Sequence, residues 1–324
     1  MTHRERAFAA LSGRIPDHVP TFELEFQLAE EFFGKPLLPE ALRPENLPKL
    51  SAAEKDRLLH EMAEYTVWVY EQLDYSILPL HGVGDFDRLE DRSDFPEAFK
   101  TFVKYVREAA GDKPLAYHGD GTFSIPDGNG MYDFAYRTAD DPEGLCDEAD
   151  RMARNAIERN KRLRDMGVDI LMLCSDYCYN SGPFLSPRMF GQFIAPYLHR
   201  IIYEARRNGQ FAIKHTDGNI MPILDQLVDC EPHALHSLDP MAGVDIREVK
   251  RLVGDRVALC GNVHCAALQT GTEQDVIDSA EYCLTYGKPG GGYIFCTSNV
   301  PFKGMPPERY KLILDVWKRM RDYN

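Results

Sequence analysis

The chain has 324 residues, 44% of them hydrophobic, which is enough to bury a large core in one α/β barrel or in two domains. Its net charge of −14 disfavours nucleic acid and anionic membranes as partners, and a polyanionic substrate unless basic residues line the site. The chain has no apolar stretch near the ~20 residues of a membrane span, a polar start and eight scattered cysteines, so we expect a cytoplasmic protein with reduced thiols.

Buried strand patterns alternate with helical patterns along the chain. The expected strands are residues 19–26, 75–80, 115–120, 169–176, 211–217, 234–239, 256–263 and 292–298. The expected helices are residues 52–73, 96–110, 143–166, 187–208, 220–228, 245–252, 274–286 and 307–321. This alternation predicts one (β/α)8 (TIM) barrel domain over residues 1–324 with an N-terminal helical extension. A doubly wound sheet is the alternative, weakened because no Gly-x-Gly-x-x-Gly follows the first strand.

Active sites of such barrels lie at the carboxyl ends of the strands. The glycine-rich stretch 121–133, which follows the third strand, could form a lid over that end. The strand ends carry more His, Cys and acidic residues than stability needs, since buried polar groups must be paired. These residues are Glu23, Glu25, His81, His118, Asp120, Cys174, Asp176, His215, Asp217, His236, Asp239, Cys260, Asn262, His264, Cys296 and Ser298.

Three of these side chains predict a zinc site. His215 and Asp217 are two residues apart on one strand, so they face the same side, and Cys296 closes the eighth strand. Imidazole, carboxylate and thiolate are all zinc ligands, and a catalytic zinc keeps one position open. Glu25 or Asp176 could fill that position without substrate. The alternative is a hydrogen-bonded His215–Asp217 pair with Cys296 packed as an apolar group, and the spacing does not decide between the two.

The other candidates are acids and a substrate wall. Glu23, Glu25 and Asp176 could act as general acid and base, with a solvated pair or a cap as the alternative. The predicted substrate-binding residues share a place at or just beyond a strand end, and they are His118, Tyr177, Tyr179 and Asn262, with Phe123 beside them. A supporting structural role is the alternative for His118, and a strand-terminal turn is the alternative for Asn262.

Short segments along nearly the whole chain resemble the uroporphyrinogen decarboxylase superfamily. They are residues 4–20, Gly167-Val168-Asp169 with Asp176, Pro196-Tyr197, His215-Thr216-Asp217-Gly218, Gly261-Asn262, Gly291-Gly292-Tyr293-Ile294 and Pro306-Pro307-Glu308. The resemblance implies a (β/α)8 barrel and one of two activities. The first is cofactor-free decarboxylation of a porphyrinogen's acetate side chains, and the second is zinc-dependent methyl transfer involving a corrinoid protein.

The residues at the first strand help to choose between these activities. Decarboxylases of the superfamily carry Arg-Gln-x-Gly-Arg there, whereas residues 21–27 of this chain are acidic and would repel a polycarboxylate. The methyltransferases carry His-x-Cys on the fifth strand and a distant Cys on the eighth. This chain matches at His215 and Cys296 but has Asp217 in the middle. With one thiolate the metal would be a stronger Lewis acid, better suited to an ether oxygen than to a thiol.

The resemblance therefore predicts a zinc methyltransferase. It would move a methyl group from a small methylated donor, such as a methoxyl compound, to a corrinoid carried by a partner protein. The corrinoid-ligating motif Asp-x-His-x-x-Gly is missing, so the chain itself is not expected to carry the corrinoid. We also consider a homodimer. The alternatives are a metal-independent decarboxylase with Asp176 as proton donor, and a non-catalytic barrel that binds a corrinoid or tetrapyrrole.

Overall fold

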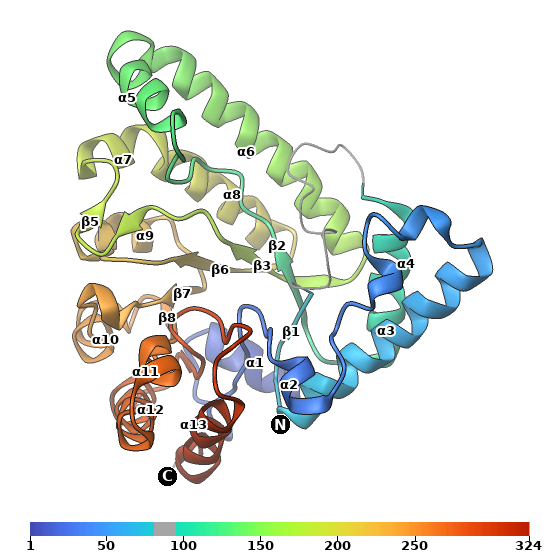
Figure 1. The fold of residues 1–324 in the computed structure, drawn as a ribbon. Helices are drawn as coiled ribbons and strands as arrows, with labels where there is room; N and C mark the ends of the chain where they lie inside the picture. Colours follow the sequence, from blue (N-terminus) through green and yellow to red (C-terminus); the bar gives the residue numbers. More distant parts are fainter. Residues whose placement is uncertain (81–94, 324) are drawn as a thin grey trace.

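The computed structural model describes residues 1–80 and 95–323, so the candidate His81 lies outside the described residues. Parallel strands form one curved sheet ringed by helices (Figure 1). In sheet order the strands are β1 (Leu78–Pro79), β2 (Leu115–His118), β3 (Val168–Leu173), β6 (Phe211–Thr216), β7 (Ala234–Ser237), β8 (Ala258–Cys260) and β9 (Tyr293–Ile294). A separate antiparallel hairpin follows β3 and consists of β4 (Cys178–Tyr179) and β5 (Gly182–Pro183).

The sheet closes into a barrel through Thr21. The N–H of Phe295 donates to the Pro20 carbonyl at 2.9 Å, and the N–H of Ser76 donates to the Thr21 carbonyl at 2.8 Å. Thr21 therefore joins the last strand to the first, which confirms the predicted barrel. The predicted strand 19–26 is reduced to this one bridge, because Pro20 has no N–H and the Glu23 side chain takes the N–H of Thr297.

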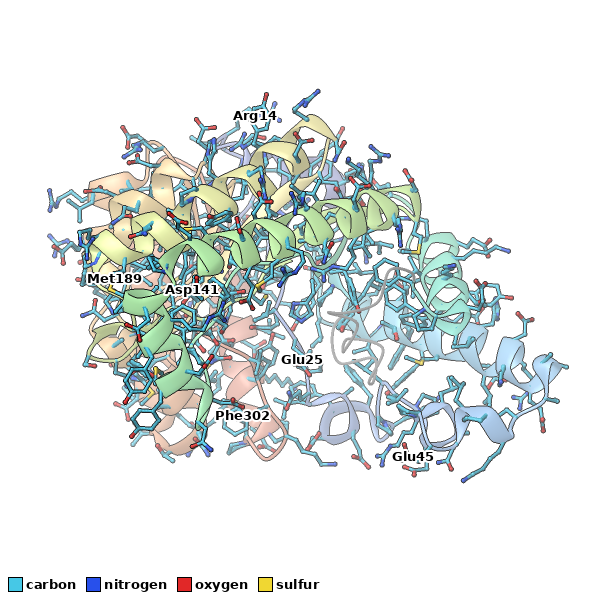
Figure 2. The ribbon with its side chains drawn as sticks, turned by 90° about the horizontal axis from the view of Figure 1, so that it is seen from above. Arg14, Glu25, Glu45, Asp141, Met189 and Phe302 are labelled. Carbon is cyan, nitrogen blue, oxygen red and sulfur yellow. The ribbon has the colours of Figure 1, made fainter. Side chains whose placement is uncertain are left out.

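Helices cover the outside of the barrel, and α6 crosses the side seen from above in Figure 2. The helices that follow the Thr21 bridge and the successive strands are α3 (Ala52–Gln72), α4 (Glu97–Ala109), α6 (Pro142–Asp165), α8 (Ala195–Arg207), α9 (Leu224–Asp229), α10 (Ile246–Val253), α12 (Glu273–Gly287) and α13 (Pro307–Met320). Shorter additions are α2 (Ala29–Phe33), α5 (Gly130–Asp140), α7 (Pro187–Phe193) and α11 (Cys265–Thr270). Single 3₁₀ turns lie at Glu40–Leu42, Leu47–Lys49, Met221–Ile223 and Pro240–Ala242.

Two further predicted segments differ from the structure. The predicted helix 187–208 divides at Ile194, where φ is −124° and ψ is −59°, because Pro196 cannot donate the backbone hydrogen bond that would continue it. The predicted lid 121–133 is not a loop throughout, since α5 begins at Gly130. Figure 1 places α5, α7 and β5 at the same end of the barrel.

The first helix, α1 (His3–Leu11), closes the other end of the barrel. Its Ala7, Ala10 and Leu11 pack into the inner core of the barrel together with residues of the strands. The Arg4 guanidinium binds Asp169 at the start of β3, with 2.6 Å between Nη2 and Oδ1. This contact places α1 at the amino ends of the strands and confirms the predicted N-terminal helical extension. Among the described residues, α1 therefore leaves the carboxyl ends of the strands as the accessible end of the barrel.

The segments around residues 25 and 301 meet at the rim of the carboxyl end. Figure 2 labels Glu25 and Phe302 in the same part of the molecule, and the Gln27 N–H donates to the Pro301 carbonyl at 3.0 Å.

Within residues 1–80 and 95–323, the helices are too short or too polar to span a lipid bilayer.

Candidate metal centre

Two carboxylates and an imidazole converge where β3 and β6 end. One ligand atom each of Asp176, His215 and Asp217 lies within 4.8 Å of the others, a combination found once among the described residues. The Nε2 atom of His215 is 3.7 Å from Asp176 Oδ1 and 3.8 Å from Asp217 Oδ1. The His215 side chain is buried, whereas 44% of Asp176 and 30% of Asp217 remain exposed. A ligand entering from the mouth can therefore reach the carboxylates.

The local sequence explains this arrangement on β6. Ile213 packs in the inner core of the barrel, and alternation brings His215 and Asp217 to the same side. Gly218 then turns the chain with φ of +82°, and a Cβ there would lie 2.4 Å from the Cys178 carbonyl oxygen. The backbone N–H of Asp217 donates to Asp176 Oδ1 at 3.2 Å and links the two strand ends.

The Asp217 carboxylate is held from two further elements. Ser237 Oγ donates to its Oδ1 at 2.9 Å, and Asn299 Nδ2 donates to its Oδ2 at 2.6 Å. Burial raises the pKa of Asp217, the His215 imidazole opposes that rise, and the Asp176 carboxylate adds to it. Two carboxylates in this setting favour a cation or a proton between them.

The His215 ring is oriented by a second histidine. β6 and β7 pair His215 with His236, and the two Nδ1 atoms are 2.7 Å apart. Burial, and then the neighbouring His215, hold the pKa of His236 well below its usual range, so His236 is neutral. Nε2 of His236 is buried and has no hydrogen-bond partner among the described residues. A contact with the Thr297 backbone opposes the lowering of the His236 pKa but does not outweigh it. Nε2 of His215 is left facing the carboxylates.

Cys296, a predicted zinc ligand, is not part of this cluster. Its side chain is fully buried in the inner core of the barrel with Ile294 and Cys260, and its Sγ lies 4.0 Å from the Ile294 carbonyl. Residues 294 and 296 both belong to this inner core, and the chain reaches the cluster three residues later, at Asn299. The structure therefore brings His215 and Asp217 together as predicted, but with Asp176 instead of Cys296.

The two glutamates have different environments. Glu23 is buried, and its carboxyl accepts hydrogen bonds from Thr297 and Tyr310. Burial raises the pKa of Glu23 to about 8, although these hydrogen bonds oppose the rise. Glu25 is partly exposed and accepts a hydrogen bond from Gln27 Nε2 at 3.0 Å. Neither glutamate belongs to the metal-binding group.

The predicted substrate wall is only partly accessible. Tyr177 is fully buried, with its hydroxyl 2.6 Å from Thr122 Oγ1 and its ring centroid 3.9 Å from Lys214 Nζ. Phe123 is also buried. Tyr179, on β4, is 46% exposed and stands at the rim. Of these aromatic residues, Tyr179 is the one a substrate could reach without rearrangement.

The two polar residues predicted to contact substrate lie in separate cavities. His118 lines a cavity of about 390 Å³ with Asp120 and Cys174, and burial lowers its pKa to about 4. Asn262 lines a cavity of about 280 Å³, and its side-chain amide donates to the backbone carbonyls of Leu238 and Val244. The structure therefore does not bring these two side chains together.

Several residues that build the site were not singled out by sequence reasoning. His236 appeared only as a strand-end residue, and Ser237 and Asn299 were not candidates. The polar run Thr297-Ser298-Asn299, which directly follows the last apolar run, was an available signal. Lys214 was another, because a lysine inside a buried strand needs a partner. The structure supplies Asp120, whose Oδ2 is 2.8 Å from Lys214 Nζ.

Comparison with known proteins identifies the family. The family model of uroporphyrinogen decarboxylase (URO-D) matches residues 85–320, well over half of the chain. The chain belongs to this family. The match confirms the superfamily that the sequence motifs predicted.

Individual relatives are more distant. Uroporphyrinogen decarboxylase of Pseudoalteromonas atlantica is 26% identical over 183 residues, covering 54% of this chain and 48% of that relative. The corresponding enzyme of Thioalkalivibrio sulfidiphilus is 27% identical over 140 residues, covering 41% and 38%. The chain spans about half the length of the curated relatives it matches. A methyltransferase from Methanosarcina mazei has a TM-score of 0.70 at 20% identity, covering 98% of this chain and 99% of that structure, which shows a shared fold.

Proposed function

We propose that this chain is a metal-dependent methyltransferase. It takes the methyl group of a small methylated donor, such as a methoxyl compound, and passes it to a corrinoid carried by a separate protein. Zinc is the proposed metal, with Asp176, His215 and Asp217 as its ligands. The observation that carries the proposal is the convergence of these three ligand atoms within 4.8 Å at the open end of the barrel. The full-length likeness in fold to a methyltransferase supports it.

The donor set fits a divalent cation. Zinc accepts imidazole and carboxylate ligands, and a catalytic zinc uses three protein ligands and one open position. The raised pKa of Asp217 reflects burial and a nearby carboxylate, both of which a bound cation would offset. Metal-bound histidines usually donate through their other ring nitrogen, and Nδ1 of His215 has His236 as its partner. The absence of a thiolate from the cluster favours an oxygen donor over a thiol substrate.

The chain's own residues would position this chemistry. When bound, the metal would supply Lewis-acid polarisation of the donor's heteroatom. His236 would hold the His215 ring in one orientation, while Ser237 and Asn299 fix both oxygens of Asp217. Asp176 is 44% exposed and leaves the site accessible from the mouth. The partner protein would approach from the same side, because α1 closes the other end.

Decarboxylation without a metal is the second candidate, because the curated relatives are uroporphyrinogen decarboxylases. In that case Asp176, whose side chain is 44% exposed at the mouth, would be the proton donor. The charges around the site favour methyl transfer instead. A polycarboxylate would meet Asp176 and Asp217, and the nearby cation Lys214 is fully buried and paired with Asp120.

Metal analysis combined with an activity assay tests the proposal. The purified protein should hold about one zinc per chain. It should also transfer methyl groups from methoxylated aromatic compounds to free cob(I)alamin, followed by the visible absorption of the corrinoid. His215→Ala and Asp217→Asn should lose both properties, whereas His199→Ala, a change on the exposed face of α8, should lose neither. A zinc-free protein that decarboxylates a porphyrinogen in the presence of chelator would overturn the proposal.

A further inference from the structure

The Glu23 carboxyl group is anchored through both of its oxygens. The backbone N–H of Thr297 lies 3.1 and 3.2 Å from its two carboxyl oxygens, and Thr297 Oγ1 lies 2.5 Å from Oε2. The Tyr310 hydroxyl donates to Oε1 at 3.1 Å and is itself 2.6 Å from the Tyr75 hydroxyl. With 1% of the residue exposed and both oxygens engaged, Glu23 cannot reach a substrate.

The same threonine leads to the candidate metal centre. Thr297 is two residues before Asn299, and its Oγ1 is 3.2 Å from the Asn299 carbonyl oxygen. The side chain of Asn299 donates to Asp217 Oδ2 at 2.6 Å. Three consecutive contacts therefore run from the interior of the barrel to a proposed metal ligand.

We propose that Glu23 is a positioning residue for the candidate metal centre, acting on Asp217 through Thr297 and Asn299. The inference rests on the proposed function only in assigning Asp217 to the metal. Glu23 would then not be one of the catalytic acids and bases that the sequence suggested. Its role would be to hold Asp217 in place without touching the metal or the substrate.

The single proton of the Thr297 hydroxyl couples the two ends of this path. It has two acceptors within reach, Glu23 Oε2 and the Asn299 carbonyl. A protonated Glu23 can donate to Thr297 Oγ1, which leaves the threonine proton for Asn299. An ionised Glu23 takes that proton and releases the Asn299 carbonyl. The anchoring of residue 299 therefore depends on which atom carries the proton.

The groups that face Glu23 do not compete for this role. They are the phenols of Tyr75 and Tyr310 and the thiols of Cys265 and Cys296. Burial raises the pKa of all four, so they are neutral in the range where a carboxyl group titrates.

Zinc competition titrations on variants of the full chain test the inference. Glu23→Ala and Asn299→Ala should each weaken zinc binding about tenfold, because supporting contacts of this kind are typically worth 10- to 100-fold in affinity. The double variant should lose no more than the weaker-binding single variant, since both changes break one path. Glu23→Gln can make the contacts of a protonated Glu23 and should bind zinc like the wild type. Glu31→Ala, at an exposed glutamate of α2, is the control.

Each other result contradicts the inference. Wild-type affinity in Glu23→Ala, or losses that add in the double variant, would show that Glu23 does not act through Asn299. If Glu23→Ala does not fold, Thr297→Val replaces it, because this change keeps the volume and removes the hydroxyl. A wild-type protein without zinc would defeat the proposed function, and the crystal structure of Thr297→Val would then decide the positioning role. Asn299 should move out of hydrogen-bond range of Asp217, and an unchanged contact would overturn the inference.

Discussion

His215 and His236 meet Nδ1 to Nδ1 at 2.7 Å, on neighbouring strands whose register pairs the two residues directly. Because one of the two atoms must donate, the tautomer of one ring fixes the tautomer of the other. A proton on His236 Nε2 leaves its Nδ1 as the acceptor, and the Nε2 lone pair of His215 then faces Asp176 and Asp217. The opposite arrangement places a proton there. The pair as a whole therefore decides whether the site receives a cation or holds a proton.

Replacing His236 tests this pair. His236→Phe cannot accept a hydrogen bond from His215 and should weaken zinc binding about tenfold, as expected when an outer contact of a metal ligand is lost. His236→Gln offers an amide oxygen and should recover part of the affinity. Zinc competition titration measures both, with His199→Ala as the surface control. Equal affinity in all three variants would mean that His236 does not orient the ligand.

Replacing Cys296 separates the two possible ligand sets. Because its thiol lies in the inner core of the barrel and outside the cluster, Cys296→Ala should keep the full zinc content. Cys296→Ser should also keep zinc but lose about 1–3 kcal/mol of unfolding free energy, since a hydroxyl is buried among apolar neighbours. Elemental analysis and urea denaturation measure the two effects. Loss of zinc in Cys296→Ala would restore the ligand set that the sequence suggested.

Much of the fold was predictable, because the spacing of apolar residues and the residues that end helices and strands are local features of the sequence. Alternating apolar runs and helical patterns gave the barrel, and His215 and Asp217 were assigned to one face by strand alternation alone. The weak first strand was not predictable, because the carbonyls of Pro20 and Thr21 accept backbone hydrogen bonds from Phe295 and Ser76, both distant in sequence. The break at Ile194 had a visible cause in Pro196.

The site was less predictable because it depends on depth and register. Alternation tells which face Cys296 takes but not which side chains it packs against. Cys296 packs with Ile294 and Cys260 in the inner core of the barrel and is not part of the group formed by Asp176, His215 and Asp217. The contact between His215 and His236 depends on the register of β6 and β7, which a single sequence does not show. The family resemblance supplied a ligand pattern with cysteines, and the chain departs from it at Asp217.

The buried ion pair between Lys214 and Asp120 should be costly to break. Lys214 is fully buried, and only 9% of the Asp120 side chain is exposed. Asp120→Ala leaves an unpaired buried ammonium and should lower the unfolding free energy by about 3–5 kcal/mol, whereas Asp120→Leu with Lys214→Met should lose less. Urea denaturation at neutral pH compares the variants. A larger loss in the double variant would show that the pair itself, and not the unpaired charge, sets the stability.

The same pair should contribute to acid sensitivity. Burial would raise the pKa of Asp120, but the Lys214 ammonium and hydrogen bonds from Thr122 and Ser175 outweigh it and hold the pKa at about 2. A folded pKa below the unfolded value of 3.8 stabilises the protein above pH 4, and this contribution is lost as the pH falls through 2. Urea denaturation between pH 5 and about 2 should therefore show a smaller decline for Asp120→Asn than for the wild type.

Glu23 should give stability the opposite dependence on pH. Burial raises the pKa of Glu23 from 4.5 to about 8, so between these values the unfolded chain releases a proton that the folded chain keeps. Because the folded state then binds more protons, the unfolding free energy falls as the pH rises from 4.5 to 8 and levels off above that.

Glu23→Gln removes the titrating group while preserving the contacts of the protonated form. Its stability should change less over this window, so the variant should gain on the wild type by several kcal/mol, as a shift of this size implies at about 1.4 kcal/mol per unit. Urea denaturation of both proteins at pH 5, 6.5 and 8 measures the difference, with Glu25→Gln as control. Parallel curves for Glu23→Gln and the wild type would mean that Glu23 is ionised in the folded protein at neutral pH, and that the Thr297 hydroxyl then donates to Glu23 and not to Asn299.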